Sequence, residues 1–163
     1  MKTAVFSICL ILWMSYAEVN AEIRILPADT LTVKVMGTSE DARFEPAVLQ
    51  LEVGDVIRFV IIEGLHTVTA YHPDNRRPLR MPESAVSFDS GMLTEGESWT
   101  LRIKEAGVYD YFCIPHERLG HAGRLIVGDV ELFPEYDNSR LPEKIVQTLV
   151  EESRKYADQR DNR

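Results

Sequence analysis

Short segments in which apolar and polar residues alternate recur from residue 31 onward, and this two-residue period constrains the fold more than any other feature. The clearest segments are LTVKV at 31–35, LQLEV at 49–53 and WTLRI at 99–103. Such alternation places the apolar side chains on one face of a β-strand, so each segment predicts a half-buried strand. HTVTAY, GVYDYFC and GRLIV predict further strands. The spacing favours an all-β sandwich of about seven or eight strands.

Two parts of this region depart from simple alternation. VIRFVII at 56–62 is more continuously apolar and predicts a central strand, and Gly54-Asp55 before it is typical of a hairpin turn. Residues 73–98 contain three prolines and little periodicity. We expect a long excursion between strands there, which is either an ordered functional segment or a mobile connection.

The N-terminal segment predicts export. Residues 1–21 combine one lysine, an apolar run from Ala4 to Met14 and small residues ending at Ala21, which is typical of a cleaved signal peptide. The alternative is an uncleaved anchor. We expect a periplasmic or otherwise exported protein with no membrane span after cleavage, because no second apolar stretch of about 20 residues follows. Its net charge of −8 disfavours nucleic acid and anionic membranes as partners.

The pattern changes after Gly128. We assign residues 22–128 to one domain and residues 129–163 to a linker and a C-terminal amphipathic α-helix. Within SRLPEKIVQTLVEESRKYADQR, Leu141, Ile145 and Leu149 form an apolar stripe at helical spacing. The helix is expected either to pack on its own chain or to mediate self-association or docking to a partner.

One cysteine and two histidines lie within nine positions of DYFCIPHERLGH, and this is the principal functional signal. Removal of the signal peptide takes Cys9 with it and leaves Cys113 as the only thiol. Alternation places Cys113 on the inward face at the end of a buried strand, where the following loop is expected to bring His116 and His121 towards the sulfur. His66, which opens an apolar strand, is the better fourth ligand. His72 lies in the turn YHPDN and is expected to be exposed.

HTV at 66–68, followed far downstream by YDYFCIPHERLGHAGRLIVG, resembles the copper-binding motif of the cupredoxins, the small blue-copper proteins, in their plastocyanin and pseudoazurin branch. FEPAVLQLEVGD and FDSGMLTEGE are also similar to segments of that family. The resemblance covers about residues 31–128 and implies a Greek-key β-sandwich or barrel of the cupredoxin type. It leaves the C-terminal segment unexplained.

The resemblance makes His66, Cys113 and His116 the three equatorial ligands of one copper ion that alternates between Cu(I) and Cu(II). The family usually has an axial methionine five residues after the second histidine, where this chain has His121. Thr67 likewise replaces a common asparagine that braces the ligand loop. An axial imidazole favours Cu(II) and lowers the reduction potential. One cysteine with three histidines is also a plausible tetrahedral zinc set, so zinc is a possible substitute.

Three classes of function follow from this site. The first is a one-electron transfer protein that docks a redox partner protein through an apolar rim around His116. The second is a copper storage, delivery or sensing protein, and the third is a copper site that binds small molecules. We expect no enzyme activity, because the sequence supplies no second metal site and no evident acid–base pair.

Overall fold

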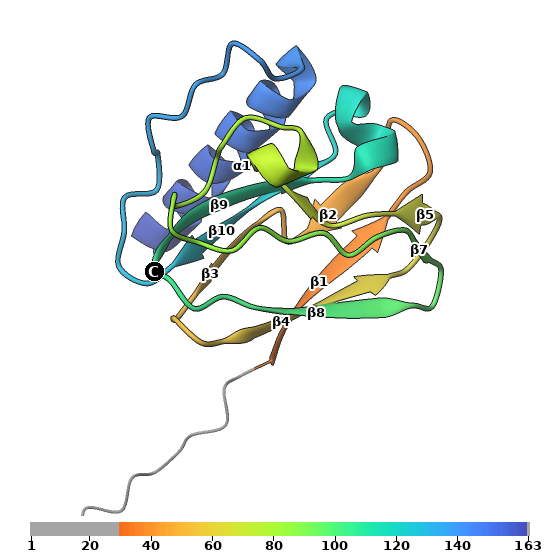
Figure 1. Ribbon diagram of the computed structural model, residues 1–163, viewed down its shortest axis with the longest axis horizontal. Helices are drawn as coiled ribbons and strands as arrows, with labels where there is room; N and C mark the ends of the chain where they lie inside the picture. The colour runs from red at the N-terminus through yellow and green to blue at the C-terminus, as the bar shows by residue number, and fades with distance from the viewer. Residues whose placement is uncertain (1–29, 163) are drawn as a thin grey trace, which may run out of the picture.

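The computed structural model describes residues 30–162, and two β-sheets packed face to face dominate it (Figure 1). One sheet has the strand order β2-β1-β4-β8, the other has the order β3-β10-β9-β6, and β5 pairs only with β7. The strands are β1 Thr30–Met36, β2 Arg43–Glu45, β3 Val48–Leu51, β4 Val56–Ile61, β5 Leu65–His66, β6 Thr69–Ala70, β7 Leu93–Thr94, β8 Ser98–Arg102, β9 Gly107–Phe112 and β10 Ala122–Val127. The predicted all-β sandwich is confirmed. The predicted signal peptide, residues 1–21, lies outside the described residues.

The most apolar strand occupies the place expected for it, whereas the predicted hairpin before it is wrong. β4 lies between β1, to which it is parallel, and β8, to which it is antiparallel. The preceding strand β3 belongs to the other sheet, where it pairs in parallel with β10. Gly54, at a φ of 97°, and Asp55 therefore turn the chain from one sheet into the other. A turn signal marks where a chain reverses but does not specify which strands pair afterwards.

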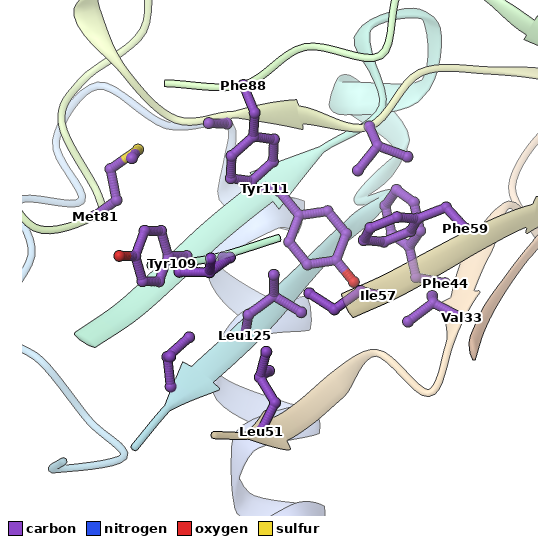
Figure 2. Close-up of a cluster of buried hydrophobic side chains, with 14 of the residues drawn as sticks. Val33, Phe44, Leu51, Ile57, Phe59, Met81, Phe88, Tyr109, Tyr111 and Leu125 are labelled. Atoms are coloured by element: carbon purple, nitrogen blue, oxygen red, sulfur yellow. The ribbon is translucent and has the colours of Figure 1, made fainter. Parts of the chain in front are cut away.

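The core fills the space between the two sheets (Figure 2). The inward face predicted for β9 is confirmed, because Tyr109, Tyr111 and Cys113 all lie in the core between the sheets. Phe112 lies on the opposite face, where the C-terminal helix buries it. Tyr111 packs edge-on against Phe44 and Phe59, with ring centroids 4.7 Å and 5.5 Å away. These aromatic rings fill the end of the core that leads towards Cys113.

The C-terminal segment forms one long helix, α1 Glu143–Asp161, which lies against the outer face of the sheet that contains β9 and β10 (Figure 1). Ile145 and Leu149 are buried in an apolar cluster with Tyr71, Phe112 and Ala122. The predicted helix is confirmed, and it packs on its own chain. No helix within residues 30–162 is long and apolar enough to cross a membrane.

A buried ion cluster ties this segment to the sandwich. Asp110, which is fully buried on β9, receives hydrogen bonds from Arg80 at 2.9 Å and from Arg124 at 2.7 Å and 3.0 Å. Arg124 also donates to Ser153 Oγ of α1 at 3.0 Å, and Arg80 donates to Asn138 Oδ1 of the linker at 2.8 Å. Because a buried charge is stable only when paired, the linker and helix complete the environment of these three residues.

The long excursion between β6 and β8 packs against the rest of the protein. It begins with a short 3₁₀ helix, η1 Pro73–Asn75, and buries Met81 and Phe88 in the main core. Asn75 fastens it further by donating to the carbonyl oxygens of Ala70 and Phe88. Of the two predicted alternatives, the structure matches an ordered segment.

Candidate metal centre

The four predicted ligands come together at one end of the sandwich, from two separate parts of the chain. His66 ends the short strand β5, and Cys113 directly follows β9. His116 lies in a second 3₁₀ helix, η2 Ile114–Leu119, and His121 directly precedes β10. One donor atom from each of the four side chains lies within 4.8 Å of all the others. Three of the side chains are buried, whereas His116 is half-buried and faces the surface.

Cys113 is the centre of this group. Its Sγ lies 3.5 Å from His66 Nδ1 and 3.4 Å from His116 Nδ1. His66 Nε2 lies 2.8 Å from the carbonyl oxygen of Glu63. A carbonyl oxygen only accepts, so Nε2 carries the proton and Nδ1 keeps a lone pair directed towards the sulfur. Such a backbone bond on the far nitrogen is the usual way in which a protein orients a metal-ligating histidine.

His121 is the least satisfied polar side chain of the group. It is only 1 % exposed, and neither ring nitrogen has a hydrogen-bond partner within residues 30–162. Its ring packs against Phe44, with centroids 4.1 Å apart, and meets the ring of His66 edge-on. A buried imidazole without any partner is costly in free energy. A bound metal ion would satisfy it, so the donor set fits a metal ion and the predicted alternative, His121 in solvent, does not match this geometry.

Burial sets the protonation of the metal-free site. Burial and, to a smaller extent, the neighbouring imidazoles of His66 and His116 together lower the pKa of His121 to about 3. Burial also lowers the pKa of His66 and raises the pKa of the Cys113 thiol. Both buried imidazoles are therefore neutral at pH 7 and offer lone pairs. A cation would favour the thiolate that burial alone disfavours.

Thr67 fastens the cysteine to the strand that carries His66. Its backbone N–H points at Cys113 Sγ at 3.4 Å, and its Oγ1 accepts a hydrogen bond from the N–H of Ile114 at 2.9 Å. Thr69 Oγ1 lies 2.9 Å from Thr67 Oγ1 and 2.9 Å from a carboxylate oxygen of Asp89. Thr67, which stands where the resemblance leads us to expect an asparagine, therefore still braces the ligand loop. Through Thr69 this hydrogen-bonded network reaches Asp89.

The loop between Cys113 and β10 closes on itself through its backbone. Cys113 N–H donates to the carbonyl of His121 at 3.0 Å, and His121 N–H donates to the carbonyl of His116 at 3.3 Å. Gly120 makes the turn at a φ of 92°, a conformation that residues with a Cβ atom adopt rarely. His72 lies outside the group and is half-buried, not exposed as predicted, because it accepts a hydrogen bond from Asp74 N–H at the start of η1.

Comparison with known proteins identifies the family to which the chain belongs. A family model described as copper binding proteins of the plastocyanin/azurin family matches residues 31–128. The chain belongs to this family. Within the family it is 36 % identical over 109 residues to a pseudoazurin from Paracoccus pantotrophus, covering 66 % of this chain and 69 % of the relative. It is 32 % identical over 102 residues to a chloroplastic plastocyanin from Tetradesmus obliquus, covering 63 % and 70 %.

A solved structure supports the same fold for this plastocyanin/azurin family member. A pseudoazurin from Sinorhizobium superposes with a TM-score of 0.59 at 23 % identity, over 76 % of this chain and 93 % of that chain. The family match contains all four candidate ligands but ends at residue 128, before the linker and α1 begin. The candidate metal centre thus lies in the part shared with the family, and the C-terminal helix lies beyond it.

Sequence reasoning missed the side chains that surround the ligands. Thr69, Asp89 and Glu117 touch the ligand loop or its brace, but each is a common polar residue with no distinctive spacing. Arg77, which binds Glu117, lies 40 residues away along the chain. No local signal could have joined them, because their proximity depends on how the long excursion folds back over the sheet.

Proposed function

We propose that this protein binds one copper ion through His66, Cys113, His116 and an axial His121 and acts as an exported one-electron transfer protein, not as an enzyme. The observation that carries the proposal is the buried, unpartnered His121 ring beside a thiol and two further imidazoles, all within bonding reach of one ion. Membership of a copper-binding family supports copper over zinc. A copper ion held by one thiolate and imidazoles supplies a one-electron couple with little rearrangement.

The residues of the site have separate tasks in this proposal. Cys113 is the thiolate ligand, and the Glu63 carbonyl and Thr67 hold His66 and the ligand loop in place. His121 is the fourth donor, shielded from water by Phe44. Dense packing around these groups keeps the ligands in nearly the same positions in both oxidation states. His121 in place of a thioether lowers the reduction potential, because imidazole favours Cu(II).

Electrons would pass through His116, the ligand nearest the surface. Two large apolar side chains flank this end of the molecule, Ile114 with 47 % and Leu65 with 45 % of their surface exposed. A small apolar surface suits a brief encounter with a redox partner protein. The net charge of −8 would steer a partner with a basic surface. Export rests on the character of residues 1–21 alone.

The test is copper loading of the mature protein followed by visible and electron paramagnetic resonance spectra. We expect a strong thiolate-to-copper band that Cys113→Ala abolishes and that His121→Met moves towards blue. Identical spectra for the wild type and His121→Met would reject the axial imidazole, and absence of the band from the wild type would reject the copper site. Zinc loading in the same assay gives a colourless control.

Electron transfer is tested separately from binding. Fast, reversible reduction of the copper-loaded protein at an electrode is expected. Copper that passes to an acceptor protein without net redox change would instead support storage or delivery. Exogenous ligands that perturb the spectrum would support a small-molecule site.

A further inference from the structure

The ligand loop is held from outside by an ion pair between a buried glutamate, Glu117, and a half-buried arginine, Arg77. Glu117, the residue after His116, is only 9 % exposed. Arg77, from the excursion after η1, binds both of its carboxylate oxygens: Nε lies 2.9 Å from Oε1 and Nη2 lies 2.7 Å from Oε2. A two-point bond of this kind fixes the carboxylate in orientation as well as in position.

Two aromatic rings make the support for this pair rigid. The Tyr71 hydroxyl donates to Glu117 Oε1 at 3.2 Å, and the Tyr71 ring stacks on Phe112 with centroids 4.4 Å apart. The guanidinium of Arg77 lies over the same Phe112 ring, 5.2 Å from its centroid. Phe112 directly precedes Cys113. The network therefore contacts the chain on both sides of the ligands Cys113 and His116.

Helix α1 closes the far end of the loop. A Cβ atom added at Gly120 would lie 3.0 Å from Thr148 Oγ1 and 3.2 Å from the Lys144 carbonyl oxygen, so the helix lies directly against the loop. Ile145 of α1 packs in the same cluster as Tyr71. Figure 1 shows η1 in yellow-green, η2 in turquoise and the start of α1 gathered at one end of the molecule. Two segments outside the usual strands, the excursion and the helix, thus converge on η2.

We propose that Glu117 and Arg77 are positioning residues that hold His116 in place for electron transfer. A 3₁₀ turn has poor hydrogen-bond geometry and little stability of its own, so η2 depends on contacts outside it. The Glu117–Arg77 ion pair supplies such contacts, and α1 packs against the other end of the loop at Gly120. The redox consequence rests on the proposed function, whereas the restraint of the loop does not.

The first test needs no metal. Hydrogen exchange of backbone amides is measured in the metal-free full-length protein for the wild type, Glu117→Gln and Arg77→Lys. We expect the Gly120 and His121 amides, which close the loop, to exchange at least about tenfold faster in both variants, while the Leu125 amide in β10 changes by less than about twofold. Lysine keeps the charge but not the two-point bond, so Arg77→Lys isolates geometry.

A matched control separates loop restraint from general stability. Leu51→Ala lowers the stability of the whole fold without touching the site, because Leu51, a core residue labelled in Figure 2, pairs with Val127 at the end of β10 away from His121. In that variant we expect no selective change at Gly120 and His121. Exchange that rises equally at Leu125 and at the loop in Glu117→Gln, or that stays within about twofold of the wild type everywhere, would overturn the proposal.

The second test uses the copper-loaded protein. Glu117→Gln leaves the Arg77 charge unneutralised near the ligand loop, so the affinity for Cu(I) relative to Cu(II) should rise by up to about tenfold, which is about 59 mV in potential. Arg77→Lys should leave the potential nearly unchanged but slow electron self-exchange. Equal rates of electron self-exchange in the wild type and Arg77→Lys would refute the redox role of the Glu117–Arg77 ion pair. If the wild type binds no copper, the proposed function fails. The hydrogen-exchange experiment on the metal-free protein still tests whether the Glu117–Arg77 ion pair restrains the ligand loop.

Discussion

The buried imidazole of His121 makes the metal-free protein sensitive to acid, and the size of this effect follows from its pKa. The pKa lies at about 3 in the folded protein, against 6.5 for an unperturbed histidine. Between these values the unfolded chain binds a proton that the folded protein does not, so stability is lost as the pH falls from about 6.5 towards 3. At pH 5 the difference spans about 1.5 units, which corresponds to about 2 kcal/mol at 1.36 kcal/mol per unit.

The assay is urea unfolding of the metal-free protein at pH 7.5 and pH 5, with a chelator present. With a slope of about 2 kcal/mol per molar urea, the midpoint of the wild type should fall by about 1 M because of His121 alone. In His121→Met, which replaces the imidazole with an adaptable apolar side chain, that part of the fall should disappear. His66, whose pKa is also lowered, stays in both proteins and cancels in the comparison.

His72→Gln serves as the matched control, since His72 lies outside the group of ligands and binds only a backbone amide and an exposed acid. It should keep the full acid sensitivity of the wild type. If the midpoints of the wild type and His121→Met fall in parallel between the two pH values, His121 is not held neutral by burial and the reasoning about the site is wrong.

Three further predictions concern the buried ion cluster, the brace of the ligand loop and the C-terminal helix. Asp110→Asn leaves two buried arginines without their counter-charge and should lower the free energy of unfolding by about 3–5 kcal/mol, measured by urea denaturation. Thr67→Val removes the acceptor for the Ile114 amide and should cost about 1 kcal/mol and broaden the copper spectrum, whereas Thr67→Asn should restore both. Truncation after Gly128 should expose the apolar cluster under α1 and abolish cooperative unfolding, measured by near-ultraviolet circular dichroism. A truncated protein that unfolds as the full chain does would contradict this last prediction.

The main strands were predictable because their apolar side chains recur at the spacing of a strand. Alternation located β1, β3, β8 and β9, and the continuous apolar run located β4 at the centre of its sheet. The strands β2 and β7 were not predicted as separate elements, since three and two residues are too short for a period to show. Strand pairing was the weaker part. The turn at Gly54 predicted a hairpin, but long-range partners placed β3 and β4 in different sheets.

The candidate ligands were easier to predict than their surroundings. Cys113, His116 and His121 are close in sequence, and a loop after a buried strand has few ways to arrange them. His66 comes from a distant strand; it was preferred to His72 because it opens an apolar strand, and the family resemblance then made it an equatorial ligand. The ion pair of Glu117 with Arg77 could not be predicted, since an acidic residue in a loop is ordinarily solvated and only the folded excursion brings Arg77 to it.

The buried cluster of Arg80, Asp110 and Arg124 restricts the order in which these three residues could change during evolution. Asp110 is surrounded by the sheet, the linker and the helix, so a carboxylate there is tolerated only where both arginines already stand. A lineage that acquired or lost one of the three alone would pass through a poorly folding ancestor. Homologues that end near residue 128 should therefore lack all three charges together, with apolar or small polar residues in their places.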